Sequence, residues 1–438
     1  SSLMNQFPTL NELKGFFSNK EGKSLFANFA QFGIYQVIIY LAPLITVPYL
    51  LRYIGVAKFG IISFAMALVY YFQIVVEYGF GITGIQMIAQ SQNNSRKQSE
   101  IVSNVLIIQI ILFSICFILL GILCFLIPKI HDYRSIYLFS YGYVLANIFL
   151  FTWFYIGVEK VKYVNVIISI SKLLYILLVI IFIKNENDFV LVPIFNSGTT
   201  FLAGIVSVII LRKKFIIRFL KPNKDILKRY LKEGWHIFLS NIAMNLYRNT
   251  NVIILGIFSS DISVGIYSAG EKIVKAIQST LSPLTQTLYP FISRKKIEEP
   301  KKSIRYISRM ITIMGFIGCI ISILLFIFAG KIAYLLNGSV NLAMVRVIRI
   351  ASFVILFGGL NYCIGIIFMT NYDMKKEFLK SVMIVGILNT IICAILCHLI
   401  SEIGAATALL LSEFILFMLL VYHIQHNKYK CSTNPLEL

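Results

Sequence analysis

Apolar runs long enough to cross a lipid bilayer recur from end to end of this 438-residue chain. A helix of about 20 apolar residues spans the roughly 30 Å hydrocarbon core of a membrane. Charged residues make up 13% of the chain, about half the share that a soluble domain carries. The runs lack the strict alternation of a membrane β-barrel, and backbone polar groups in lipid must bond internally, so we expect transmembrane helices.

The apolar runs predict about twelve spans, and therefore an all-α polytopic membrane protein. We place the spans at 24–50, 60–90, 101–127, 135–157, 164–183, 189–211, 235–258, 264–292, 307–330, 344–370, 378–400 and 403–423. The longest predicted loop on the side of the termini, 212–234, separates a six-helix N-terminal lobe (1–211) from a six-helix C-terminal lobe (235–438). We expect the two lobes to surround a central cavity.

Basic residues are distributed unevenly between the two sides of the predicted membrane protein. Of the 40 Lys and Arg residues, 28 fall on the side of the termini, counting two at adjoining span ends, and six fall in the opposite loops. Cytoplasmic loops are rich in Lys and Arg, so both termini are predicted in the cytoplasm. The net charge of +21 therefore indicates orientation and contact with anionic phospholipids, with no nucleic acid partner.

Two connecting segments have an amphipathic pattern. In 212–234, which carries nine basic residues, four apolar positions share one helical face: Ile226, Leu227, Tyr230 and Leu231. This pattern predicts a helix on the membrane surface. Residues 8–20 look similar, and an ordinary solvated connector explains that piece equally well.

The two halves of the chain resemble each other at an offset of 205 residues. Residues 59–73 and 264–278 share five identities, and each segment opens the second span of its half. The identical pairs are Gly60 and Gly265, Ile61 and Ile266, Ser63 and Ser268, Val69 and Val274, and Gln73 and Gln278. The lobes are therefore expected to be parallel repeats, related by an axis along the membrane normal.

Polar residues inside the predicted spans mark a candidate substrate cavity, because charge in hydrocarbon is costly unless it faces water or a partner. The candidates within spans are mostly basic or amide side chains: Lys172, Asn241, Asn245, Arg248, Lys272, Lys275, Gln278, Arg346 and Arg349. Several have a structural alternative. Glu271 and Lys275 can neutralise each other on one helix, Arg346 and Arg349 can reach lipid phosphate, and Arg248 can brace against Glu271.

Motifs of catalytic sites are absent from the sequence. It contains no GxxxxGK[ST] phosphate-binding loop, no HExxH and no GxSxG. We therefore expect neither an enzyme nor a bound cofactor or metal, and no direct use of ATP.

Several segments resemble the polysaccharide transporter family of the multidrug/oligosaccharidyl-lipid/polysaccharide exporter superfamily, the Wzx-type flippases. Residues 43–65 carry a Pro-Tyr-x-x-Arg-x-x-Gly stretch that includes Arg52. The resemblance continues in "EYGFG" at 77–81, "WFYIGVEK" at 153–160, "GIYSAGEKI" at 265–273 and "LYP" at 288–290. It covers nearly the whole chain, because the order and spacing of the motifs also agree.

This resemblance implies a flippase that moves undecaprenyl-pyrophosphate-linked oligosaccharide, of O-antigen or capsule type, across the bacterial cytoplasmic membrane by alternating access. A polysaccharide polymerase and a chain-length regulator are the protein partners it implies. Arg52 joins the cavity candidates, and Glu77 and Glu271 become candidates for coupling to an ion gradient. A multidrug or toxin antiporter of the same superfamily, a peptidoglycan-precursor flippase and a membrane glycan polymerase or ligase are the alternatives. Basic residues in the spans oppose the first, and short outside loops oppose the last.

Overall fold

The computed structural model describes residues 20–91, 94–281, 292 and 300–426, and within these ranges the chain forms helices and no strands. The elements of the N-terminal half are α2 (Lys20–Tyr53), α3 (Gly55–Glu77), α4 (Phe80–Gln90), α5 (Ser95–Leu126), α6 (Pro128–Asp132), α7 (Arg134–Leu150), α8 (Thr152–Gly157), α9 (Val161–Phe182), η2 (Glu186–Val190) and α10 (Leu191–Lys214). Those of the C-terminal half are α11 (Lys224–Phe258), α12 (Asp261–Ser279), α14 (Pro300–Asn337), α15 (Leu342–Asn361), the π-helix η3 (Tyr362–Met369) and α16 (Lys375–His426).

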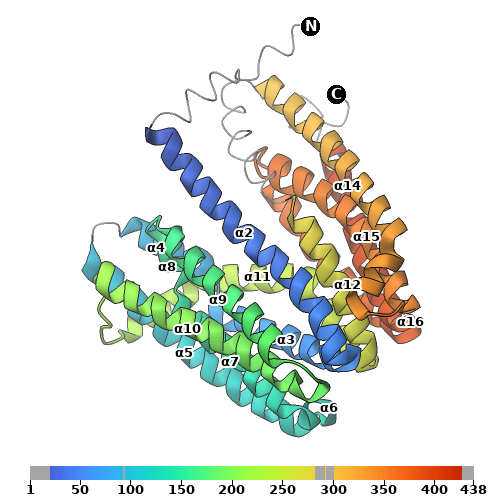
Figure 1. Cartoon of the computed structure of the whole chain (residues 1–438). Coiled ribbons are helices and arrows are strands. Elements are labelled where there is room, and N and C mark those ends of the chain that lie inside the picture. The colour runs from blue at the N-terminus through green and yellow to red at the C-terminus, as the bar shows by residue number, and fades with distance from the viewer. Residues whose placement is uncertain (1–19, 92–93, 282–291, 293–299, 427–438) are drawn as a thin grey trace.

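The helices are arranged in two lobes, as predicted from the sequence (Figure 1). One lobe contains α2 to α10 and the other α11 to α16. The lobes pack together mainly through α3 on α12, and α2 runs between them in contact with α9, α12 and α14. We call the end where the lobes meet the closed end; it includes the α2–α3 and α11–α12 corners. The lobes diverge toward the opposite, open end (Figure 1).

Nine helical stretches within the described ranges are long and apolar enough to cross a membrane. The last of them, α16, has 52 residues and is broken at Ile400 and Ser401, close to the predicted boundary between two spans. Helices α11 and α12 are not among the nine, and they carry many polar residues. The multi-span fold is thus confirmed, and the number twelve stays a prediction.

Two predicted spans are interrupted by residues in the left-handed region. Tyr78 (φ 48°) and Gly79 (φ 81°) end α3 before α4 begins, and Phe151 (φ 48°) separates α7 from α8. Left-handed residues end a helix because they cannot continue its hydrogen bonds. The predicted span 264–292 is helical to Ser279, and most of its remainder lies outside the described residues.

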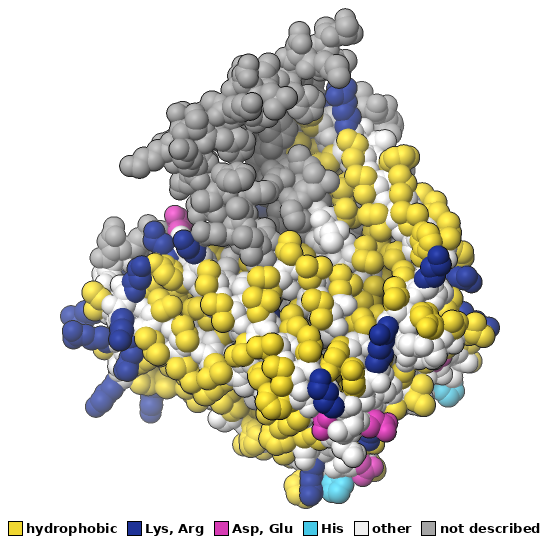
Figure 2. Space-filling model, in the orientation of Figure 1, with side chains coloured by type: hydrophobic (Ala, Val, Ile, Leu, Met, Phe, Trp, Pro, Cys, Tyr) yellow, Lys and Arg dark blue, Asp and Glu magenta, His cyan; other side chains and the backbone are white. Residues whose placement is uncertain are grey.

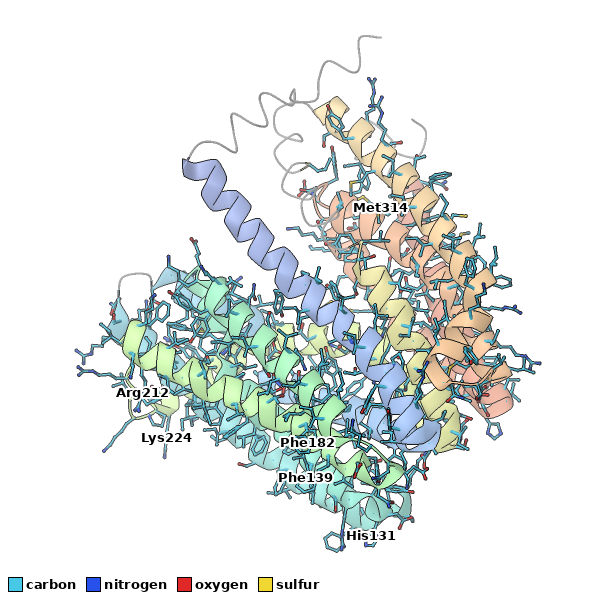
Figure 3. The ribbon with its side chains drawn as sticks, in the orientation of Figure 1. His131, Phe139, Phe182, Arg212, Lys224 and Met314 are labelled. Atoms are coloured by element: carbon cyan, nitrogen blue, oxygen red, sulfur yellow. The ribbon has the colours of Figure 1, made fainter. Side chains whose placement is uncertain are left out.

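Hydrophobic and charged side chains are distributed over the surface of the molecule as expected of a membrane protein. Hydrophobic side chains cover the flank of both lobes, and Lys and Arg gather toward the ends (Figure 2). Phe139 and Phe182 project from this flank, while Arg212 and Lys224 lie at the end of the lobe opposite His131 (Figure 3). Large apolar residues exposed in this way have lipid as their natural environment.

The segment 212–234 differs from the predicted surface helix. Residues 216–223 are not helical, and 224–234 continue directly into the membrane part of α11. Backbone N–H groups of Arg218 and Leu220 donate to the hydroxyls of Ser99 and Ser103 on α5, at 3.1 and 2.8 Å. The predicted apolar face, with Tyr230 5% exposed, packs on the N-terminal lobe, so protein rather than lipid covers it. The other amphipathic candidate, 8–20, lies almost wholly outside the described residues.

The predicted repeat appears as a reciprocal contact between α3 and α12. A Cβ atom added at Gly60 would lie 1.9 Å from the carbonyl oxygen of Asp261, and one added at Gly265 would lie 2.1 Å from that of Val56. Gly60 and Val56 correspond to Gly265 and Asp261 at the offset of 205 residues. Glycine at both positions therefore allows the backbones of the two lobes to touch across a pseudo-twofold axis.

Two polar contacts join the lobes beside this crossing. The ammonium of Lys129, in α6, lies 2.9 Å from the Asp261 carboxylate and donates to the Gly256 carbonyl oxygen at 2.7 Å. Arg52, at the end of α2, donates to the carbonyl oxygen of Leu335 on α14. Both contacts hold the closed end together.

Candidate functional site

A cavity of about 410 Å³ lies between the two lobes on the inner side of the closed end. Helices α2, α3, α7, α9 and α10 form one wall, and α11 and α12 form the other. We call it the central cavity. Its charged lining residues are three lysines and one carboxylate: Lys172, Lys272, Lys275 and Glu271. These four were all predicted from the sequence.

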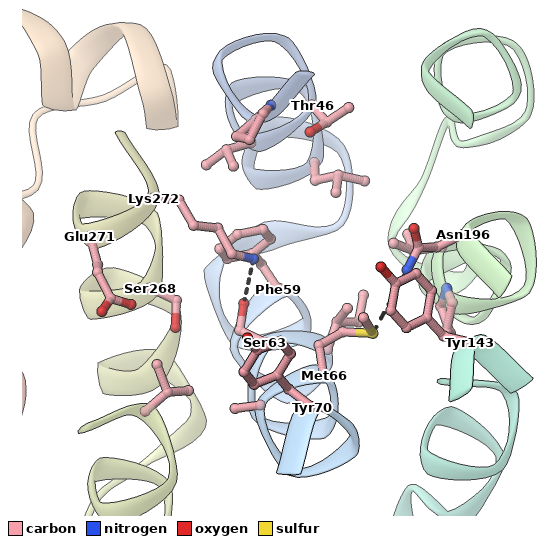
Figure 4. Close-up of a pocket in the computed structure, with 18 of the residues that line it drawn as sticks. Thr46, Phe59, Ser63, Met66, Tyr70, Tyr143, Asn196, Ser268, Glu271 and Lys272 are labelled. Atoms are coloured by element: carbon pink, nitrogen blue, oxygen red, sulfur yellow. Dashed lines mark hydrogen bonds between the residues drawn. The ribbon is translucent and has the colours of Figure 1, made fainter. Parts of the chain in front are cut away.

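Lys272 reaches from α12 across the cavity toward α3 (Figure 4). Its ammonium donates to the Ser63 hydroxyl at 3.4 Å and lies 4.7 Å from the centre of the Phe59 ring. Lys272 follows Asp261 by eleven residues, which at 1.5 Å per residue places it about 16 Å from the closed end of α12. A bilayer core is about 30 Å thick, so a membrane with one face at the closed end would have this cation near its mid-depth.

Lys172 extends from α9 on the opposite wall. Its ammonium donates to the Asn196 amide oxygen at 3.3 Å and lies within 6 Å of the Tyr143 and Tyr175 ring centres. Tyr143 and Asn196 face the cavity together (Figure 4). The aromatic faces stabilise the cation without neutralising it. The two lobes thus each bring a lysine to the same cavity.

Glu271 and Lys275 form the helical ion pair that the sequence analysis gave as the structural alternative to a role in a cationic cavity. The Lys275 ammonium lies 2.9 Å from Glu271 Oε1, which also accepts a hydrogen bond from the Tyr267 hydroxyl at 3.2 Å. Glu271 is 7% exposed. This pair offsets one positive charge, so the described lining of the central cavity keeps an excess of cations.

A second cavity, of about 560 Å³, lies mainly within the C-terminal lobe, with Tyr70 of α3 also in its lining, and we call it the side cavity. It is lined by Asn245 and Gln278, as predicted, and by Asn249. Asn241 lines neither cavity; its carbonyl oxygen accepts a hydrogen bond from the Asn245 amide at 2.8 Å. Arg248 lies on α11 between Asn245 and Asn249, but its side chain is outside the described part of the structure, so its role stays a prediction.

Four other candidates do not line either cavity. Arg52 is occupied at the closed end, as described above. Arg346 and Arg349 are exposed, and the Arg349 guanidinium lies 5.2 Å from the centre of the Phe326 ring on α14. Glu77 is the last residue of α3, and its carboxylate lies beside Gly81 of α4. Arg52, Arg346 and Arg349 therefore line neither cavity and Glu77 lies apart from both, so a substrate-binding or coupling role for these four residues stays a prediction.

The sequence analysis missed two polar residues of the side cavity, Asn361 and Glu413. The Asn361 amide donates to the Glu413 carboxylate at 2.7 Å and to the Glu413 carbonyl oxygen at 2.9 Å. Glu413 is an acidic residue in the middle of a predicted span, and that signal alone could have identified it. Asn361 also lies inside a predicted span, 344–370, so the same signal, a polar side chain within an apolar run, could have identified it.

Two lobes of long apolar helices with a cavity of polar lining between them define a polytopic membrane protein of the transporter type. Two solved structures share the fold at 14% identity. An inward-facing multidrug resistance transporter of the MATE family has a TM-score of 0.68, covering 91% of this chain and 96% of that chain. The lipid II flippase MurJ, in an inward closed conformation, has a TM-score of 0.64, covering 90% and 87%.

Sequence comparison gives the family. Residues 25–296 match the model of the polysaccharide biosynthesis protein family, and the chain belongs to that family. A protein of Escherichia coli strain K12, provisionally named an O-antigen transporter, is 31% identical over 410 residues, which are 94% of this chain and 99% of the relative. A Shigella dysenteriae protein with the same name is 28% identical over 258 residues, 58% of this chain and 64% of that protein.

Proposed function

We propose that this protein is a flippase that moves undecaprenyl-pyrophosphate-linked oligosaccharide across the bacterial cytoplasmic membrane by alternating access. The observation that carries the proposal is the central cavity, where Lys172 and Lys272 come from different lobes and one carboxylate accompanies three lysines. A site built from both lobes is taken apart when the lobes rock, which is what alternating access requires.

A pyrophosphate group fits the chemistry of this cavity. At an effective dielectric constant of 20, two unit charges 4 Å apart interact by about 4 kcal/mol, so lysines at mid-depth offset much of the cost of moving phosphate out of water. Lysine ammonium groups bind phosphate oxygens as point charges. The amide and hydroxyl groups of Asn196, Asn249 and Ser63 supply partners for polar parts of the substrate.

The names of the relatives agree with this substrate class. The two proteins with similar sequences are named for O-antigen transport, and one protein of the same fold is named a lipid II flippase. We propose that the closed end faces the periplasm and that the open end, with the basic segment 212–234, faces the cytoplasm. The structure would then correspond to a state that loads substrate from the inner leaflet.

The test is a set of neutral lysine variants in a strain that lacks this protein and cannot make its surface glycan. Lys272→Gln should reduce glycan synthesis and weaken binding of the lipid-linked oligosaccharide by about 30-fold, because losing one partner of a buried charge pair costs about 2 kcal/mol. Lys331→Gln removes an exposed lysine of α14 and is the matched control. Normal glycan synthesis by well-expressed Lys272→Gln and Lys172→Gln variants would reject the proposed site.

Multidrug antiport is the second candidate, favoured by the likeness to a multidrug transporter fold. A cavity for cationic drugs should present unpaired carboxylates, and the only carboxylate in the described lining of the central cavity is paired with Lys275. Resistance to cationic dyes in cells that express the protein would favour this candidate, and failure to restore glycan would strengthen it.

A further inference from the structure

The side cavity continues the central cavity toward the open end. Three residues line both: Tyr70, Asn249 and Lys275. On α12, the lining residues pass from Lys272 in the central cavity to Gln278 in the side cavity, moving away from the closed end. A molecule whose anionic group sits beside Lys272 therefore has a connected space for the part that follows.

The lining of the side cavity differs chemically from that of the central cavity. Its polar groups are mostly amides, with one carboxylate, two phenols, one hydroxyl and the shared lysine: Asn245, Asn249, Gln278, Asn361, Glu413, Tyr70, Tyr362, Ser279 and Lys275. Phe378 and Leu409 are among the apolar residues of the wall. Amides offer both donors and acceptors, whereas a carboxylate accepts only. This mixture suits a ligand that carries many hydroxyl groups on an apolar ring.

Asn361 provides the sharpest evidence for what binds there. Its side chain is 5% exposed, and its amide nitrogen donates to Glu413, yet its Oδ1 atom has no hydrogen-bond partner within the described part of the chain. A buried hydrogen-bond acceptor without a donor raises the free energy of the folded state. Such an atom therefore usually accepts a hydrogen bond from water or from a ligand. Phosphate at neutral pH offers oxygen acceptors and little to donate. Sugar hydroxyl and acetamido N–H groups are donors.

The absence of a side chain at Gly358 leaves space for the Gln278 side chain. A Cβ atom added at Gly358 would lie 2.1 Å from Gln278 Nε2 and 3.8 Å from Glu413 Oε2. The amide end of Gln278 thus lies against the backbone of α15, close to the Asn361 and Glu413 pair. The substitution Gly358→Ala would displace this amide without removing any polar group from the cavity.

We propose that the side cavity binds the sugar next to the pyrophosphate, an uncharged hexose or N-acetylhexosamine, through Gln278, Asn361 and Glu413. This inference rests on the proposed function, since it assigns the first sugar of the same lipid-linked substrate to the side cavity. The pyrophosphate lies in the central cavity beside the lysines, and the glycan extends toward the open end.

The test compares two ligands on purified full-length protein in lipid nanodiscs: undecaprenyl pyrophosphate, and undecaprenyl pyrophosphate carrying one N-acetylglucosamine. Gln278→Ala and Gly358→Ala should weaken binding of the sugar-bearing lipid about tenfold and that of the sugar-free lipid less than twofold, as expected for one or two neutral hydrogen bonds. Lys272→Gln should weaken both ligands alike. Gln86→Ala, on the exposed face of α4, should change neither.

The outcomes separate this inference from the proposed function. If both side-cavity variants weaken the two lipids equally, or change neither, the sugar site is wrong while the pyrophosphate site stands. If the wild-type protein binds neither lipid, the proposed function fails and the sugar site fails with it. A selective loss for the sugar-bearing lipid supports the assignment.

Discussion

The crossing of α3 and α12 gives a prediction that can be worked from distances. A methyl group added by Gly265→Ala would lie 2.1 Å from the Val56 carbonyl oxygen. The shortest comfortable contact between carbon and a carbonyl oxygen is about 3.3 Å, so the two backbones must separate by roughly 1.2 Å. Overpacking of this kind costs about 1–3 kcal/mol. The clash exists only while the lobes touch at the closed end.

Gly265→Ala should therefore shift the protein toward a state in which the closed end is parted. A difference of about 1–3 kcal/mol changes the ratio of the two states by roughly 5- to 150-fold. Gly60→Ala should act in the same direction, because its methyl group would meet the Asp261 carbonyl oxygen at 1.9 Å. One separation relieves both clashes, so the double variant should fall short of the sum of the single effects.

The assay is electron–electron distance measurement between spin labels at Phe125 and Leu342, in a background without native cysteines. Both positions are exposed, at 86% and 68%, and they belong to different lobes near the closed end. Gly330→Ala is the matched control, since a Cβ atom there meets nothing within 4 Å. If Gly265→Ala leaves the distance distribution of the wild-type protein unchanged, glycine at this crossing does not govern closure and the reasoning is refuted.

Two further predictions concern Arg248 and the orientation of the chain in the membrane. Arg248→Ala should abolish glycan synthesis at a normal membrane level of the protein, and Arg248→Lys should keep part of it, because an ammonium lacks the forked hydrogen bonds of guanidinium; restoration of the Ala variant by a second change at Glu271 would indicate a structural brace instead. Single cysteines at Asn223 and Thr433 should react with a thiol reagent only after the cytoplasmic side is made accessible, and labelling from outside intact cells would contradict the proposed orientation.

The sequence predicted the fold and the central cavity well because each depends on a strong physical constraint. Long apolar runs form membrane helices, and a lysine inside such a run is stable where it faces a polar space, as Lys172 and Lys272 do. The 205-residue repeat pointed to the two glycines that meet at the crossing, although their contact could not be foreseen.

Whether a polar side chain faces the cavity or the outer surface was harder to predict, because this depends on how each helix is rotated about its axis relative to its neighbours. Arg346 and Arg349 have the same sequence signal as Lys272, yet their face of α15 is exposed. The apolar face around Tyr230 has the pattern of a membrane-surface helix, but the N-terminal lobe covers it. An amphipathic pattern predicts that the apolar face of a helix is buried. Whether lipid or protein covers that face depends on how the helix packs against its neighbours.

The ion pair at the closed end leads to a prediction about the sign of its charges. Asp261 is the first residue of α12, and Lys129 donates to the Gly256 carbonyl oxygen in the last turn of α11. A helix favours negative charge at its N-terminus and positive charge at its C-terminus, by about 0.3–1 kcal/mol each. The direct attraction adds at most about 1 kcal/mol, because the two side chains are 32% and 25% exposed.

Each charge therefore matches a helix end as well as its partner. Asp261 stays at the N-terminus of its own helix when the lobes part, so Asp261→Asn loses only the mutual attraction and should shift the population toward a parted closed end by up to about fivefold. Lys129→Gln loses the end of α11 as well, up to about 2 kcal/mol in all, and should shift it by up to about 30-fold. The charge-swapped double variant, Lys129→Glu with Asp261→Lys, restores the mutual attraction but places each charge at the wrong helix end. It should consequently remain shifted rather than recover. Full recovery of the wild-type distance distribution by the swap would mean that the pair acts through mutual attraction alone, and that the helix ends at this corner contribute nothing to closure.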